Sequence, residues 1–307
     1  MKFKRTTLAV AAATALGLGA VGTAQADAYG FSNLRAYQIS TSFDCNNTGT
    51  DNCITLTGYN AQSLSSANLV AGGGDSGFDA VVGIPPATNP DALEAQVGGG
   101  AGENQFTRPQ GNGQVGDYAR GDSQIVSQQV AGAAFTEVNA VAEGNLISQT
   151  ISSASGTTTS GTSVTVDLEA NEQFTLTLSM IADWYLESFA DPGDGPATVT
   201  SNFALQLVQG GNVLFELSPG ELQLDFTDDD TTDGMSTINS GVAQPFSDTS
   251  QPFDAGTYSL AYSHGVTTLL ANTPAVPAPA TLALLGLGLA GLGFGRRKRN
   301  THTVAAG

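Results

Sequence analysis

The sequence predicts an all-β protein, with an antiparallel β-sandwich or jelly-roll-like body between two short apolar segments. Three observations lead to this prediction. Short runs of β-branched and aromatic residues recur along the chain, several of them alternate apolar with polar residues, and glycine-rich turns separate them. The body has no sustained helical period. Many short strands at turn-rich spacing are typical of sandwiches and jelly rolls.

The clearest strand signals lie in the second half of the chain. In 173–180, Phe174, Leu176 and Leu178 alternate with threonine and serine, so one face of this strand is expected to be buried and the other to be polar. The sequence Gly210-Gly211-Asn212 predicts a hairpin between two such runs, and the turn 254–256 leads into a late strand. The predicted strands are 163–168, 173–180, 199–208, 213–217, 222–226 and 257–262.

The first half of the body carries weaker signals. Residues 124–153 fit either one amphipathic helix or two strands, and Gly132 and Gly144, which bracket the segment, favour strands. Residues 27–150 are expected either to form a separate domain or to complete one sandwich that spans 27–270. Glycine-rich or Ser/Thr/Gly-rich stretches predict loops or linkers at 71–77, 98–104, 109–117 and 152–163.

The charge distribution excludes several function classes. All 28 acidic residues lie between Asp27 and Asp254, and this stretch holds three basic residues, all arginines, for a formal charge of −25. A chain this acidic repels phosphate, so nucleic acid is not an expected partner. Because the stretch contains no lysine, lysine-based catalysis and a P-loop are excluded as well.

The N-terminus has the features of a secretory signal peptide. Residues 1–26 begin with basic residues, continue with an apolar run and close with Ala24-Gln25-Ala26, which offers signal peptidase the small residues it needs. We expect the mature protein to begin at Asp27. The alternative is an anchor that stays in the membrane, which the shortness of the apolar run disfavours.

The C-terminal segment has three consecutive parts. A Pro/Ala linker at 271–280 precedes an apolar stretch at 281–295 and a basic tail at 296–307. Counted from Ala280, the apolar stretch has 16 residues, about 24 Å of helix against a hydrocarbon core of about 30 Å, so it is a marginal membrane span. Positive charges hold such a tail on the cytoplasmic side. The residues that define the segment are Val276, Pro277, Ala278, Pro279, Arg296, Arg297, Lys298 and Arg299.

This order of parts resembles the PEP-CTERM sorting signal of Gram-negative bacteria, in which Pro-Glu-Pro precedes a short Leu/Gly helix and an arginine cluster. Here Ala278 stands where the family has glutamate, and eight residues follow the basic cluster. The resemblance implies processing by an exosortase, a membrane protease that removes the tail and delivers the body to the cell surface or the exopolysaccharide matrix. The chain is then expected to reside in the inner membrane only transiently.

Cys45 and Cys53 are the only cysteines of the chain. In an exported protein they are expected to form a disulfide that closes the intervening loop. A redox-active pair is expected nearer to C-x-x-C spacing, and a metal site lacks companion histidines or cysteines. The predicted bridge is therefore structural.

The densest acidic cluster, 225–234, suggests calcium as the one cofactor to consider. Asp229, Thr231 and Asp233 follow the alternate spacing of a calcium loop and a glycine comes next, but Ser240 at the twelfth position cannot supply a bidentate carboxylate. The alternative is a solvated acidic loop that binds no metal. The candidate calcium ligands are Asp228, Asp229, Asp230 and Asp233.

Signals of catalysis are sparse. His264 is the only histidine of the predicted mature body, and Ser263 beside it lacks a G-x-S-x-G elbow, so a serine hydrolase is not expected. Trp184-Tyr185 is either a platform for stacking sugars or, for the tryptophan, a residue of the core or of a sheet face. Arg120-Gly121-Asp122 spells an integrin-binding tripeptide, but Arg120 is expected instead to pair with a carboxylate.

These observations favour a non-enzymatic surface or extracellular-matrix protein associated with exopolysaccharide. The alternatives are a carbohydrate- or calcium-binding module and a polysaccharide-active enzyme, which a cleft with two facing carboxylates would favour. The expected partners are signal peptidase, an exosortase-type protease and exopolysaccharide.

Overall fold

The computed structural model describes residues 28–49, 53–70, 73–83, 91–98, 116–129, 134–147, 154–190, 195–228 and 236–272. The chain divides into two units, Met1–Thr273 and Pro274–Gly307, and all described residues belong to the first. The predicted signal peptide, membrane segment and basic tail lie outside the described residues. Within the described part, no helix is long and apolar enough to cross a membrane.

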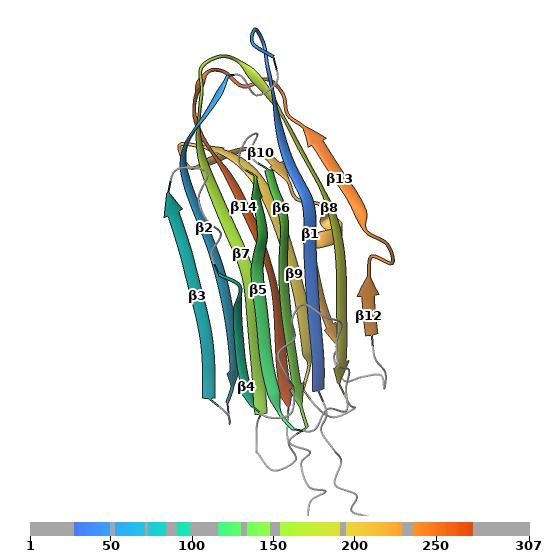
Figure 1. The fold of residues 1–307 in the computed structure, drawn as a ribbon. Coiled ribbons are helices and arrows are strands. Elements are labelled where there is room, and N and C mark those ends of the chain that lie inside the picture. Colours follow the sequence, from blue (N-terminus) through green and yellow to red (C-terminus); the bar gives the residue numbers. More distant parts are fainter. Residues whose placement is uncertain are drawn as a thin grey trace, which may run out of the picture. The chain divides into compact units, whose positions relative to one another are not determined.

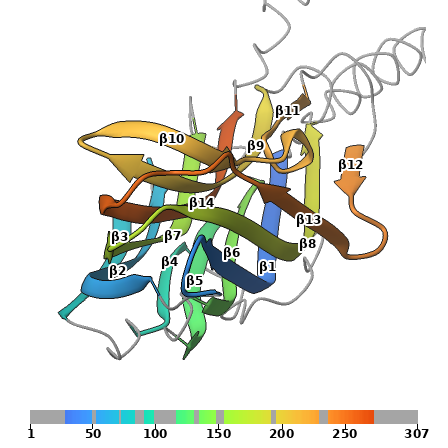
Figure 2. The same cartoon turned by 90° about the horizontal axis from the view of Figure 1, so that it is seen from above.

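The described body is built from β-strands, and every strand pairing in it is antiparallel. The prediction of an all-β antiparallel fold is therefore confirmed. Two sheets, here called sheet A and sheet B, form two layers (Figures 1 and 2).

Sheet A has the strand order β12-β8-β1-β6-β5-β4, and β13 pairs with β8 along the same edge as β12 (Figure 1). Its edge beside β8 is thus formed by two short strands in succession. The strands of sheet A are β1 (Ala28–Cys45), β4 (Leu93–Gly98), β5 (Tyr118–Gln129), β6 (Ala134–Leu146), β8 (Phe174–Ala190), β12 (Ser236–Asn239) and β13 (Gln244–Thr249).

Sheet B has the order β10-β9-β14-β7-β2-β3, and β11 also pairs with β9. Residues before 148 supply strands to both sheets, so this part of the chain belongs to the same two sheets as the later strands. The strands of sheet B are β2 (Ile54–Leu69), β3 (Gly73–Gly83), β7 (Ala154–Ala170), β9 (Ala197–Gln209), β10 (Asn212–Leu217), β11 (Leu224–Asp228) and β14 (Gly256–Asn272), with a 3-10 turn at Gly220–Leu222 before β11.

The inner faces of the two sheets form one apolar core. Alternate residues of β8 are buried over most of its length, as its sequence pattern predicts. Leu176 and Leu178 from sheet A belong to the same buried cluster as Val166, Leu205 and Leu260 from sheet B. Burial of each such side chain stabilises the fold by about 1.5–3 kcal/mol, so this contact holds the layers together.

Elsewhere the sheets approach through small and hydroxyl-bearing residues. A Cβ atom on Gly30 of β1 would come within 2.6 Å of Thr268 Cγ2 on β14, so this position accepts only glycine without a shift. Hydroxyl groups of sheet B donate to backbone oxygens of sheet A, from Thr268 to Ala142 at 3.1 Å and from Thr158 to Glu143 at 3.1 Å. These bonds satisfy polar groups that the close approach buries.

Two predicted loops are strands instead. Residues 154–163 of the Ser/Thr/Gly tract lie in β7, where Thr158, Ser160 and Thr162 are buried. These hydroxyl-bearing residues lie where the two sheets meet through polar groups. Composition alone does not reveal that a Ser/Thr/Gly tract can form a buried strand of this kind. In the stretch 71–77, residues from Gly73 onward belong to β3.

The other local predictions are mostly confirmed. The segment 124–153 contributes to β5 and β6, so the helical alternative is wrong. The hairpin between β9 and β10 turns at Gly210 and Gly211, whose φ angles of 57° and 83° favour glycine. The strand expected at 222–226 begins only at Leu224, because the 3-10 turn occupies the preceding residues.

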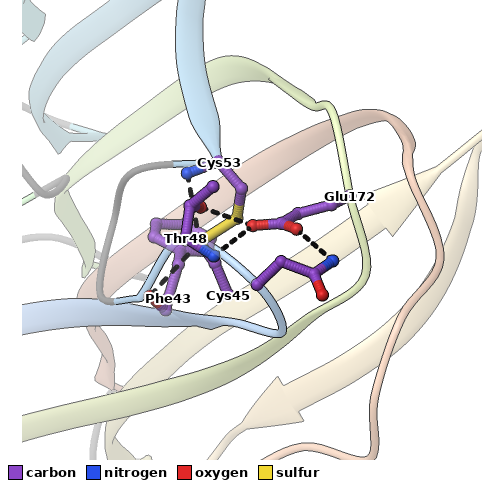
Figure 3. Close-up of a disulfide and its surroundings, with 6 residues drawn as sticks. Phe43, Cys45, Thr48, Cys53 and Glu172 are labelled. Carbon is purple, nitrogen blue, oxygen red and sulfur yellow. Dashed lines mark hydrogen bonds between the residues drawn. A yellow bond between two sulfur atoms is a disulfide. The ribbon is translucent and has the colours of Figure 1, made fainter.

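The predicted disulfide between Cys45 and Cys53 is confirmed, with a sequence separation of 8. It joins the end of β1 to the residue before β2 (Figure 3). Glu172, between β7 and β8, accepts hydrogen bonds from Asn47 Nδ2 at 2.6 Å and from the Thr48 backbone N–H at 2.9 Å. The Thr48 hydroxyl also donates to Glu172. This hydrogen bond has the largest effect in lowering the pKa of Glu172, and the bonds from Asn47 and the Thr48 backbone add to it. The loop is therefore fixed by a covalent bond and by a carboxylate.

Candidate functional site

A cleft of about 610 Å³ lies on the outer face of sheet A. Its lining comes from β1, β6, β8 and the connection between β12 and β13. Strand alternation explains its position, because Leu34 and Ala36 of β1 belong to the core while Asn33 and Arg35 point to the other face.

The register of three adjacent strands brings the polar lining together. Arg35 on the central strand β1 is the pairing partner of Asn139 on β6 and of Asp183 on β8. Two residues earlier on β1 and on the same face, Asn33 is the pairing partner of Tyr185 on β8. Side chains of directly paired residues share a face and lie about 4.5–5.5 Å apart at Cβ, so these five form two neighbouring rows.

An interruption of the edge strand builds one wall of the cleft. β12 ends opposite Tyr185 and β13 begins opposite Ala182, and the intervening residues 240–243 leave the ladder. The departure is held by Asn239 Oδ1, which accepts from the Gly241 N–H at 2.8 Å, while Ser240 N–H donates to the Trp184 carbonyl at 3.1 Å. Gly241 has a φ of 68°, a conformation that glycine adopts without strain.

The charged groups of the cleft are partly paired. Arg35 Nε donates to Glu137 Oε1 at 2.7 Å, and Asn139 Nδ2 donates to the same oxygen at 3.1 Å. The hydrogen bond to Glu137 raises the pKa of Arg35. Burial raises the pKa of Asp183, against the opposing effect of Arg35, and the negative charge of Glu137 adds to the increase. Asp183 therefore holds its proton to a higher pH than an exposed aspartate does.

Of the two neighbouring aromatic residues Trp184 and Tyr185, it is Tyr185 whose side chain lies on the outer face of sheet A and lines the cleft. Its hydroxyl donates to Glu187 Oε2 at 2.6 Å, and its ring meets Phe31 edge-to-face at a centroid distance of 5.9 Å. Trp184 also borders the cleft, but it is only 8% exposed, belongs to the main core cluster and packs near Phe246. Because side chains alternate along a strand, Trp184 points into the core and Tyr185 points to the outer face, so the two do not form one aromatic platform.

A buried ion pair lies on the same face of sheet A. Arg120 of β5 donates from Nε and Nη2 to Glu143 Oε2 of β6, with the Nε bond at 2.9 Å. Tyr29 and Tyr118 donate their hydroxyls to Glu143 Oε1 at 3.1 Å and 2.7 Å. The expected pairing of Arg120 with a carboxylate is confirmed. Arg120 and Asp122 are 2% and 4% exposed, so the tripeptide is not displayed on the surface.

The remaining candidate residues do not assemble into a site within the described residues. His264 is buried and Ser263 is exposed on the opposite face of β14, so they do not form a catalytic pair. Asp228 ends β11 and is buried, whereas Asp229, Asp230 and Asp233 lie outside the described residues, so calcium binding stays a prediction. The residues of the signal cleavage site and of the sorting segment also lie outside them.

Cys45, Cys53 and Glu172 place three potential ligand atoms within 4.8 Å of one another. Both sulfur atoms are joined in the disulfide, so neither is a thiolate, the form in which cysteine binds metals. The disulfide and the hydrogen bonds of Glu172 therefore have a structural role, because they hold the loop that follows β1 (Figure 3).

Comparison with known proteins identifies the tail. Residues 275–299 match the family model of the PEP-CTERM protein-sorting motif. No curated protein and no solved structure matches the chain. The motif implies export and membrane-associated sorting toward the cell surface, with processing by an exosortase, a membrane protease. Together with the all-β body, this defines a class of exported, surface-directed β proteins. More specifically, the chain is a PEP-CTERM protein.

Proposed function

We propose that this protein, once trimmed by the exosortase, is a non-enzymatic component of the cell surface or exopolysaccharide matrix of a Gram-negative bacterium. The sorting motif at 275–299 is the observation that carries this proposal. The disulfide supports it, because such bonds persist in oxidising compartments outside the cytoplasm. The acidic composition supports it as well, since a strong net charge keeps a protein soluble among other macromolecules.

The tail provides the first test of this proposal. We expect replacement of Arg296, Arg297, Lys298 and Arg299 by serine to leave the chain mis-oriented or secreted with its tail intact. The physical reason is that a marginal span of 16 residues depends on flanking positive charge to fix its orientation in the membrane. Mass spectrometry of surface material measures the outcome through peptides that cover 282–294.

A matched variant that exchanges the three arginines of this cluster for lysine, and so keeps all four charges, should be processed as the natural protein is. Recovery of the 282–294 peptides in full yield from the natural surface form would instead identify a permanent anchor, and the processing proposal would fail.

Matrix association is tested separately from processing. In cells that lack exopolysaccharide synthesis, we expect the trimmed protein to be released into the medium, because its polysaccharide support is absent. Immunoblots of cell-surface and medium fractions measure this, and an unrelated exported protein serves as the loading control. Equal retention with and without exopolysaccharide would contradict the matrix role and leave the sorting intact.

A polysaccharide-active enzyme is the second candidate function. One observation favours it: the cleft contains two carboxylates, Glu137 and Asp183, and burial raises the pKa of the second. Two neighbouring carboxyl groups, one of them with a raised pKa, are the pairing that glycoside hydrolysis uses. However, Glu137 already accepts bonds from Arg35 and Asn139, which supports a structural or binding role for this carboxylate.

A further inference from the structure

We propose that the cleft on the outer face of sheet A is a binding site for a neutral polysaccharide, with Tyr185 as the surface on which a sugar ring rests. The choice of ligand rests on the proposed matrix function. The volume of about 610 Å³ lies within the range of pockets that hold small organic ligands, about 300–1,000 Å³.

The hydrogen-bonding groups of the cleft suit sugar hydroxyls. Asn33, Asn139 and Asn239 line it, and a side-chain amide offers both donors and an acceptor. A sugar hydroxyl likewise both donates and accepts. Asn139 directs its Nδ2 to Glu137, so its amide orientation is fixed with the oxygen as the acceptor. Amides of this kind bind hydroxyls without requiring a charge on the ligand.

The aromatic surface is held in place before any ligand arrives. The hydroxyl of Tyr185 is bonded to Glu187 and its ring is in edge-to-face contact with Phe31, so both ends of the side chain are restrained. The faces of an aromatic ring are apolar and carry negative electrostatic potential, which suits the C–H groups on one side of a pyranose. A restrained ring loses little conformational freedom on binding, which favours affinity.

The charge of the site selects against acidic polysaccharides. Among the described residues, Arg35 is the basic side chain that retains substantial exposure, at 44%, and it is already paired with Glu137. Asp183 and the excess of carboxylates in the body add negative potential. A uronate-rich polymer would have to bring its own negative charges to this surface, where the described residues offer no unpaired cation to receive them. A neutral polymer meets no such barrier.

Affinity gel electrophoresis of the exported protein, purified from the producing cells, tests the proposal. We expect gels that contain neutral galactomannan or neutral β-glucan to slow the protein, and gels with acidic alginate to leave its mobility unchanged. Tyr185→Ala should weaken binding about tenfold, whereas Tyr185→Phe, which keeps the ring, should retain it. Phe78→Ala is the matched control, because it removes an aromatic ring that is 62% exposed on β3 of sheet B.

If Tyr185→Ala does not fold, as circular dichroism would reveal, Asn33→Leu provides the second variant: it keeps the side-chain size and should also weaken binding. Absence of retardation by both neutral polymers, or equal retardation by alginate, would overturn the proposal. Retardation that Phe78→Ala abolishes and Tyr185→Ala does not would also overturn it. Release of reducing ends from a bound polymer would leave the binding site in place and overturn the non-enzymatic function instead.

Discussion

Glu143→Gln is expected to lower the free energy of unfolding by about 3–5 kcal/mol. The substitution keeps the shape of the side chain and an oxygen that can accept from Tyr29 and Tyr118, but it removes the negative charge opposite Arg120. Both partners of this pair are almost completely buried, with side-chain exposures of 2% and 0%. The guanidinium would then remain in a low-dielectric environment without the negative charge that Glu143 supplies to it through Oε2. Urea unfolding followed by circular dichroism measures the loss.

The double variant Arg120→Met/Glu143→Gln isolates the charge effect. It removes the buried cation together with its counterion and retains the amide oxygen for the two tyrosine hydroxyls. We therefore expect it to recover at least half of the stability lost in Glu143→Gln, since replacement of a buried pair by uncharged groups is often neutral. A double variant less stable than the single one would show that packing of the arginine stem, and not its charge, dominates.

The sequence predicts the architecture where local pattern and burial agree. In β8, alternation of apolar and polar residues matches the buried and exposed faces, and the glycines between β9 and β10 mark the hairpin. The pattern fails in β7, because the face that Thr158 and Ser160 present to the other sheet is polar. Such a polar contact depends on the strand that lies opposite, which no local signal records.

The candidate site is less predictable for the same reason. Sequence adjacency singled out Tyr185, but its polar neighbours come from strands far apart in the chain: Arg35 and Glu137 are separated by 102 positions. The available signal was an i, i+2 repeat of polar residues, Asn33 with Arg35 and Glu137 with Asn139. This repeat identifies an outer face. The register that joins the repeats becomes visible only in the sheet.

Acidification is expected to destabilise the body through His264. Its Nε2 lies 2.7 Å from the Leu34 carbonyl oxygen, which can only accept, so Nε2 carries the proton of the neutral ring. A second proton must therefore reside on Nδ1, which has no hydrogen-bond partner among the described groups. Burial lowers the pKa of His264 to about 4 in the folded protein, from 6.5 for an unperturbed histidine.

The sign of the effect follows from these two pKa values. Between pH 6.5 and pH 4 the unfolded chain binds a proton that the folded protein does not, so the contribution is complete above pH 6.5 and is lost as the pH falls toward 4. The expected loss between pH 7 and pH 4 is about 3 kcal/mol. Asp183 acts in the opposite direction, because its raised pKa favours the folded state at low pH.

The difference in free energy of unfolding between the natural protein and the His264→Gln variant isolates the contribution of His264 from that of Asp183. Glutamine can donate to the Leu34 carbonyl but does not titrate, whereas Asp183 and the other carboxylates are common to both proteins. Urea unfolding at pH 7, 5.5 and 4 should therefore show the stability advantage of the natural protein over the variant shrinking as the pH falls. A constant difference across this range would mean that the folded protein accommodates the imidazolium, and that the polar contact between the sheets supplies an acceptor to Nδ1.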